Sequence, residues 1–196
     1  IWFVTQQHTY FGGFVLALPI FCVIFEVLGL ITRDRLSAAR YDRLARDFLQ
    51  VALLALSLTA LVGSLMLALF VKLYPSFMSY MGGTFRPMMP IYAVVFLGET
   101  VFLAAYYYSW DHLTHPAYKW GHAALGLVAN GLGVVLLLLA NAWAAFMMAP
   151  AGVDEQGRYL GNIWHLLHSA LWNPLNVHRF LADLMSGGAV VLAYSS

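Results

Sequence analysis

The stretch Phe11–Ile31, FGGFVLALPIFCVIFEVLGLI, decides the fold class of this chain. Glu26 is its only charged residue. About 20 apolar residues, rising ~1.5 Å each, are enough to cross the hydrocarbon core of a bilayer. The run is too long for the apolar part of a signal peptide, and no small-residue cleavage site follows it. We therefore expect a membrane-spanning helix that the mature protein retains.

The rest of the chain repeats this pattern. Hydrophobic residues make up 62% of the sequence and charged residues 10%, whereas a soluble domain has about 25% charged residues. This composition excludes a soluble domain, and a net charge of +1 does not indicate a nucleic-acid partner. We predict an all-α, polytopic transmembrane bundle of about five helices, a single membrane domain over 1–196 that belongs to a longer subunit. The predicted spans are 11–31, 48–73, 88–108, 123–148 and 180–196, with an interfacial loop at 149–179.

The distribution of positive charge predicts the orientation of the bundle. The connection after the first span carries five arginines and the connection after the third carries Lys119, so these two hold six of the ten Lys and Arg residues. By the positive-inside rule these connections lie in the cytoplasm, and the N-terminus lies outside. The long fourth connection is rich in Trp and Leu. It is either an amphipathic segment in the interface or a helix packed over the outer end of the bundle.

Two glutamates fall inside the predicted spans, where ionisable groups are costly and usually face the bundle interior. Glu99 lies ~16 Å into its helix, and no Lys or Arg in the same helix can pair with it. A carboxyl at that depth is favoured in its neutral form, so it suits a proton relay or a single hydrogen bond between helices. Glu26 follows His8 by five helical turns, ~27 Å along one face. It is the weaker candidate for a proton path.

Two histidines precede predicted spans that start on the same side of the membrane. His8 comes before the first span and His178 before the fifth, so both imidazoles reach the outer face. They are either solvated or ligands of heme iron. No Cys-x-x-Cys-His sequence occurs, which excludes covalently attached heme c. We interpret His112, His115 and His122 as interfacial residues near the cytoplasmic side.

Several short motifs occur in the order found in one membrane-protein family. They are 96–102 (FLGETVF), 110–113 (WDHL), 140–143 (ANAW), 173–180 (NPLNVHRF) and 186–187 (SG). With these motifs, and with the spacing from His8 to Glu26, the chain resembles the N-terminal part of subunit I of cytochrome bd-type quinol oxidases. The resemblance covers nearly the whole chain but only about the first half of such a subunit.

The resemblance implies that His8 ligates a high-spin heme near the outer face. It also implies that Glu99 lies on a proton path or near the hemes. The cofactors would be one or more hemes b, with heme d as an alternative, and quinol would be the substrate. Partners would be other membrane subunits of a respiratory complex within a bilayer of the bacterial cytoplasmic-membrane type.

Two departures from the family pattern leave two functions open. The family's second glutamate, two turns before Glu99, is missing from 90–92 (PIY), and its low-spin heme histidine would fall at Ala182. His178 lies one turn earlier and is the remaining candidate ligand. The chain is then either a heme-bearing subunit of an oxidase that reduces dioxygen, or a related electron-transfer subunit of a larger respiratory complex that does not.

Overall fold

The computed structural model describes residues 1–113 and 116–195, and its regular secondary structure there is helical apart from one isolated β-bridge between Val153 and Tyr159. The prediction of an all-α bundle is therefore confirmed. In chain order the helices are α1 (Trp2–Ile31), α2 (Arg35–Leu73), α3 (Pro75–Thr84), the 3₁₀ turn η1 (Arg86–Met88), α4 (Met89–Tyr108), α5 (Pro116–Met148), α6 (Ile163–Leu167) and α7 (Trp172–Ser195).

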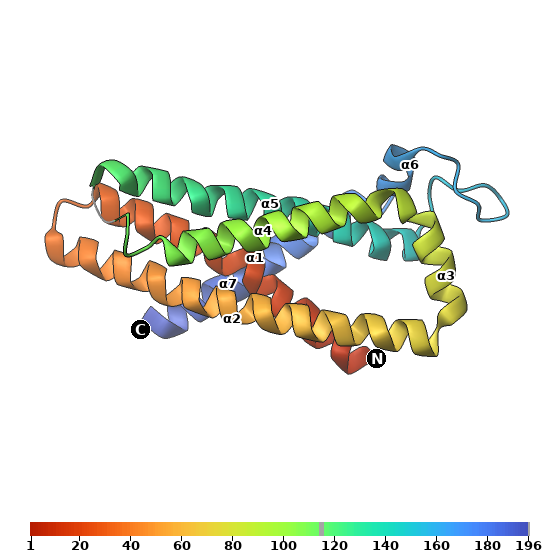
Figure 1. The fold of residues 1–196 in the computed structure, drawn as a ribbon, viewed down its shortest axis with the longest axis horizontal. Helices are drawn as coiled ribbons and strands as arrows, with labels where there is room; N and C mark the ends of the chain where they lie inside the picture. Colours follow the sequence, from red (N-terminus) through yellow and green to blue (C-terminus); the bar gives the residue numbers. More distant parts are fainter. Residues whose placement is uncertain (114–115, 196) are drawn as a thin grey trace.

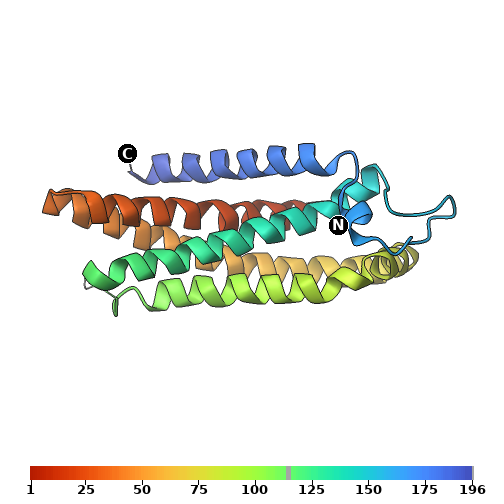
Figure 2. The same ribbon diagram turned by 90° about the horizontal axis from the view of Figure 1, so that it is seen from above.

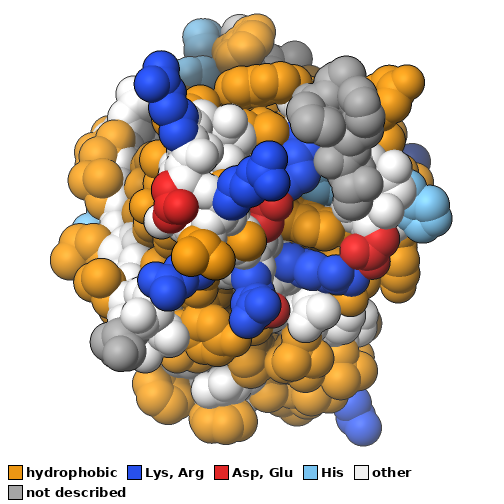
Figure 3. Space-filling model, turned by 90° about the vertical axis from the view of Figure 1, so that its left-hand side faces the viewer, with side chains coloured by type: hydrophobic (Ala, Val, Ile, Leu, Met, Phe, Trp, Pro, Cys, Tyr) orange, Lys and Arg blue, Asp and Glu red, His pale blue; other side chains and the backbone are white. Residues whose placement is uncertain are grey.

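The five long helices lie side by side along one axis (Figures 1 and 2). The turn between α1 and α2 is at one end, and α3, α6 and the N-terminus are at the other. Lys and Arg side chains gather at the first of these ends (Figure 3). We call it the basic end and define it by Arg33, Arg35, Arg40, Arg43, Arg46 and Lys119.

Local sequence explains where the helices begin. Asp34 caps α2 by accepting hydrogen bonds from the Ser37 amide at 2.9 Å and from the Ser37 hydroxyl at 2.6 Å. These bonds stabilise the carboxylate and lower the pKa of Asp34. Pro75 is the first residue of α3, where no backbone N–H is needed. Pro174 likewise lies in the first turn of α7, so this helix begins at Trp172, ahead of the predicted span at 180.

Within the described residues, four helical segments have the length and hydropathy to cross a membrane: Trp2–Ile31, Arg35–Leu73, Arg86–Tyr108 and Tyr118–Met148. Their outward faces carry exposed apolar side chains such as Leu61 (67% exposed) and Val94 (71% exposed), which suits contact with lipid. Helix α7 has 24 residues, which is long enough, but Arg179 and Asp183 reduce its hydropathy. The membrane span predicted at 180–196 is therefore still untested.

The connection between α5 and α7 packs over one end of the bundle. Leu166 and Leu167 of α6 are buried in an apolar cluster with Phe85 and Phe146, while Trp164 is exposed. Helix α6 therefore packs over the end of the bundle, and the interfacial position of the loop at 149–179 stays a prediction.

Helices α1 and α7 run parallel and meet closely. Gly13 lies against Asp183, and Gly187 lies against Ala17, so positions increase together along both helices. A methyl group on Gly187 would lie 2.5 Å from Ala17 Cβ, well inside the distance that two carbon atoms tolerate. The absence of a side chain at this position lets the two helices approach.

We predict that Gly187→Ala destabilises the protein, because α7 must move away from α1; overpacking of this kind costs about 1–3 kcal/mol. Gly188→Ala is the matched control, since its methyl group would meet only the Phe21 ring edge at 3.4 Å. Thermal unfolding of the purified complex measures both. Equal midpoints for the two variants would contradict the close contact.

Candidate functional site

His8 lies inside α1, one and a half turns after the helix begins, and not ahead of the helix as the apolar pattern suggested. Its Nδ1 is 3.0 Å from the backbone carbonyl oxygen of Thr59 in α2. Because a carbonyl only accepts, Nδ1 carries a hydrogen, and in the neutral ring Nε2 then has the lone pair. One edge of the ring lies close to Gly63, where an added Cβ would come within 2.7 Å of His8 Cε1 and 2.9 Å of His8 Nδ1. Among the residues that the structure describes, His8 Nε2 has no hydrogen-bond partner.

His178 lies in the second turn of α7 and its side chain is exposed. The parallel contacts of α1 and α7 place it at the same end of the bundle as His8. His8 and His178 therefore lie at the same level along the bundle, as expected if both histidines reach the same face of the membrane. The two rings contact different surroundings, since His8 packs on α2 while His178 points outward.

Glu99 is 5% exposed and lies between α1, α4 and α5. Its Oε1 would be 2.7 Å from a Cβ on Gly133, so the carboxyl rests on the backbone of α5. It lines a crevice, too narrow for a water molecule, with Val15, Leu16, Pro19, Leu103, Ala129, Asn130 and Gly133. Pro19 has no N–H for the Val15 carbonyl, and Asn130 Oδ1 is buried with no partner in the described part of the chain.

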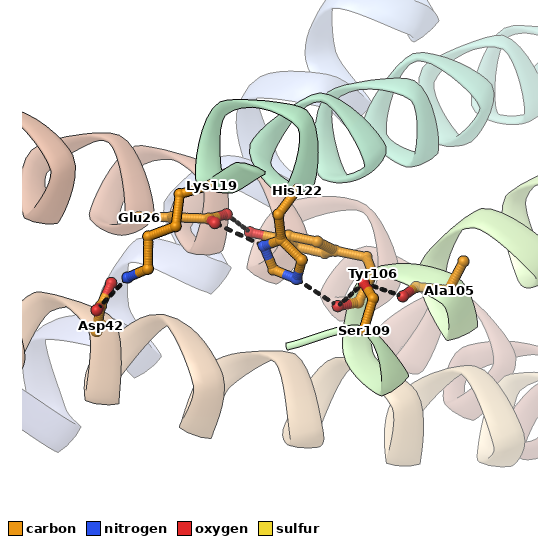
Figure 4. Close-up of polar contacts among 7 residues, drawn as sticks. All are labelled: Glu26, Asp42, Ala105, Tyr106, Ser109, Lys119 and His122. Atoms are coloured by element: carbon orange, nitrogen blue, oxygen red, sulfur yellow. Dashed lines mark hydrogen bonds and ion pairs between the residues drawn. The ribbon is translucent and has the colours of Figure 1, made fainter. Parts of the chain in front are cut away.

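A second buried acid has hydrogen-bond partners, whereas Glu99 has none among the described residues. Glu26 Oε1 is 2.5 Å from His122 Nδ1, and the Tyr106 hydroxyl donates to Glu26 Oε2 at 2.8 Å (Figure 4). His122 Nε2 donates to the Tyr106 carbonyl at 2.8 Å. Trp110 packs edge-on against the imidazole with a ring-centroid distance of 4.8 Å. This cluster joins α1, α4 and α5.

The cluster corrects the interpretation of His122. The sequence placed it at the interface, but the structure leaves only 2% of it exposed, and Glu26 is 1% exposed. Sequence reasoning missed the cluster because the three partners are 16 to 96 residues apart. One signal was available: the end of α1, the end of α4 and the start of α5 meet at the basic end, which places Glu26, Tyr106 and His122 at one depth.

The other histidines that the structure describes do not join a buried site. His112 is exposed, with Nδ1 3.2 Å from the Tyr108 carbonyl, as expected for an interfacial residue. His168 packs between Trp164 and Trp172. His115 lies outside the described residues.

Two ion pairs cover the cluster at the basic end. Lys119 pairs with Asp42, and both side chains are partly exposed. Arg46 pairs with Asp111 at 2.6 Å, further into solvent. Among the described residues, no group of three or more His, Cys, Asp and Glu side chains could hold a bare metal ion.

The fold and these residues define a class: a helical membrane protein with two histidines at one end and two buried acids in its core. The family comparison is more specific. The family model for cytochrome bd terminal oxidase subunit I matches residues 2–196, so the chain belongs to this family. No curated protein matches it. The family makes the chain a membrane subunit of a respiratory oxidase, and the suspected resemblance is confirmed.

We predict that Tyr106→Phe destabilises the complex. Removing the hydroxyl leaves Glu26 Oε2 buried without its donor, which costs about 1–3 kcal/mol. The matched control is Tyr108→Phe, because the Tyr108 side chain is 72% exposed. Thermal unfolding midpoints report the difference. If Tyr106→Phe is as harmless as Tyr108→Phe, the hydroxyl does not support the buried acid.

Proposed function

We propose that this chain is the heme-binding part of a bd-type oxidase, which moves electrons from quinol through hemes to dioxygen with proton uptake. The observation that carries the proposal is the geometry of His8. A histidine that ligates a metal usually donates its other ring N–H to a carbonyl or a carboxylate, which fixes the tautomer and the ring orientation. The bond from His8 Nδ1 to the Thr59 carbonyl has this form.

The residues present therefore fit a heme at His8. Nε2 would bind the iron, Thr59 would hold the ring, and Gly63 leaves the ring room to lie on α2. When bound, heme supplies an iron that accepts and donates single electrons and, where a coordination position is open, binds dioxygen. Heme b suits both electron transfer and this site, with heme d as the alternative for the oxygen-binding position.

His178 is our candidate for a second heme ligand. It is exposed on α7 at the level of His8, so a porphyrin could approach it from outside the described helices. This position is one turn before Ala182, where the family's ligand is expected, and the heme would be displaced accordingly.

Glu99 would handle protons for the oxygen chemistry. It lies at mid-depth among apolar neighbours, where a carboxyl can change between neutral and charged forms. Because the crevice has no room for water, proton exchange at Glu99 requires a slight separation of α1, α4 and α5. Glu26 would be a second proton-exchanging group of the same bundle.

The rest of the proposal follows from the family. The basic end would face the cytoplasm, and the histidine end the outside of a bacterial-type inner membrane. Quinol, lipid and further membrane subunits of the respiratory complex would be the partners. The missing acid at 90–92 and the displaced histidine support one other candidate, an electron-transfer subunit that holds hemes without reducing dioxygen.

We predict that His8→Ala removes one heme from the purified complex, because among the described histidines only His8 packs on α2 with its Nδ1 held by Thr59. His112→Ala should leave the heme content unchanged, since His112 is exposed at the opposite, basic end. Reduced-minus-oxidised absorption spectra with heme quantification measure both. Full heme content in His8→Ala would overturn the ligand assignment. Hemes without quinol-driven oxygen consumption in the unaltered complex would favour the electron-transfer candidate.

We predict that Glu99→Gln keeps the heme content but slows oxygen consumption. The amide has the shape of the carboxyl and carries no transferable acid proton, and losing such a group typically costs about 10²–10⁴-fold in rate. Glu155→Gln, at an exposed loop position, is the control. Unchanged oxygen consumption in Glu99→Gln would show that its proton is not used.

A further inference from the structure

The hydrogen bonds around Glu26 and His122 leave one proton position undetermined. His122 Nε2 faces a carbonyl oxygen and must carry a hydrogen, and the Tyr106 hydroxyl must donate to Glu26 Oε2. In the geometry shown, with Glu26 Oε1 2.5 Å from His122 Nδ1, one proton lies between the two atoms, because without it two lone pairs would face each other. That proton can bond to either atom.

Burial limits the charge that this pair can hold. Both side chains are almost fully buried, and an unpaired charge in such a place is strongly disfavoured. With one proton between them the pair is neutral overall, either as carboxyl and imidazole or as carboxylate and imidazolium. Without it, the pair carries one negative charge. Loading the pair therefore changes the charge of the core by one unit.

Titratable and charged groups surround the pair on α1, α2, α4 and α5. Cys22 is one turn before Glu26 on α1, and Tyr106 faces it from α4. Asp42 comes from α2 and Lys119 from α5, paired with each other next to the cluster (Figure 4). Lys119 is one turn from His122 on α5. Asp111 and Arg46 are paired further out.

The Lys119–Asp42 ion pair lies between the buried cluster and the solvent at the basic end. The two side chains are 20% and 32% exposed, whereas His122 and Glu26 are 3% and 1% exposed. Asp42 Oδ1 is also buried without a hydrogen-bond partner in the part of the chain described. A charged, partly wetted pair thus lies between solvent at the basic end and the buried acid and base.

We propose that Glu26 and His122 form a one-proton binding site, loaded from water at the basic end past Lys119 and Asp42. Loading breaks one O–H bond of a hydronium ion, which leaves as water, and forms one O–H bond at Glu26 Oε1; transfer to His122 breaks that bond and forms an N–H bond at Nδ1, with no change in electron count. The Tyr106 hydroxyl and carbonyl hold both partners in position throughout. This inference deepens the proposed function, since dioxygen reduction consumes protons.

The test uses the whole complex and pH-dependent infrared difference spectra, recorded in H₂O and D₂O. The decisive variant carries Glu26→Gln together with His122→Gln. Two amides can still hydrogen-bond to each other and to Tyr106, so the tie between helices is kept, but they carry no titrating proton. The control is His112→Gln. The unaltered complex should show a carboxyl band and an imidazole band that change together with pH.

In the double variant both bands should be lost, and the complex should bind one proton fewer across the titration, while its heme content stays unchanged. Retention of both bands and of the full proton count would overturn the proposal. If the double variant does not assemble, Glu26→Gln alone decides, because it should remove the carboxyl band. Heme spectra are read separately, so loss of the proposed heme function and loss of this proton site give different results.

Discussion

The hydrogen bond between the Glu26 carboxyl and the His122 imidazole determines how three of the helices meet. In the interior of a membrane bundle, lipid offers no hydrogen bonds, so each polar group must find its partner within the protein. Glu26 and His122 do so across α1 and α5, and Tyr106 joins them from α4 with its hydroxyl and its carbonyl. The register of these helices sets the crevice in which Glu99 lies, two turns from Tyr106 along α4.

Helix α1 connects this cluster with the other candidate residues. It presents His8 to α2 near one end and Glu26 to α4 and α5 near the other. Between them Gly13 and Ala17 allow α7 to approach, which brings His178 to the level of His8. The candidate heme ligands and the candidate proton groups therefore lie at different depths of the same bundle. Such a separation suits a protein that takes electrons and protons from different sides.

The sequence alone predicted the features of the protein that depend on local sequence pattern. Apolar runs of about 20 residues identify the long helices, and the arginines of the first connection identify the basic end. The spacing of His8 and Glu26, with short motifs in order, pointed to the family that the comparison shows.

The partners of the buried groups could not be found in this way, because they depend on contacts across the bundle. His122 begins an apolar run and resembles an interfacial residue until α1 and α4 are packed against α5. The carbonyl that orients His8 belongs to Thr59, 51 residues away, and nothing in the local sequence marks it. Likewise, Gly63 looks unremarkable until the His8 ring lies on it.

The central claim is that His8 binds heme iron through Nε2 while Thr59 holds Nδ1. A density map of the complete complex, resolved well enough to place side chains at the end of the bundle opposite the basic end, tests it most directly. We expect iron within bonding distance of Nε2 and the Nδ1 bond to the Thr59 carbonyl unchanged. A map in which Nε2 of His8 faces lipid or another side chain, with the porphyrins bound elsewhere, would contradict the account.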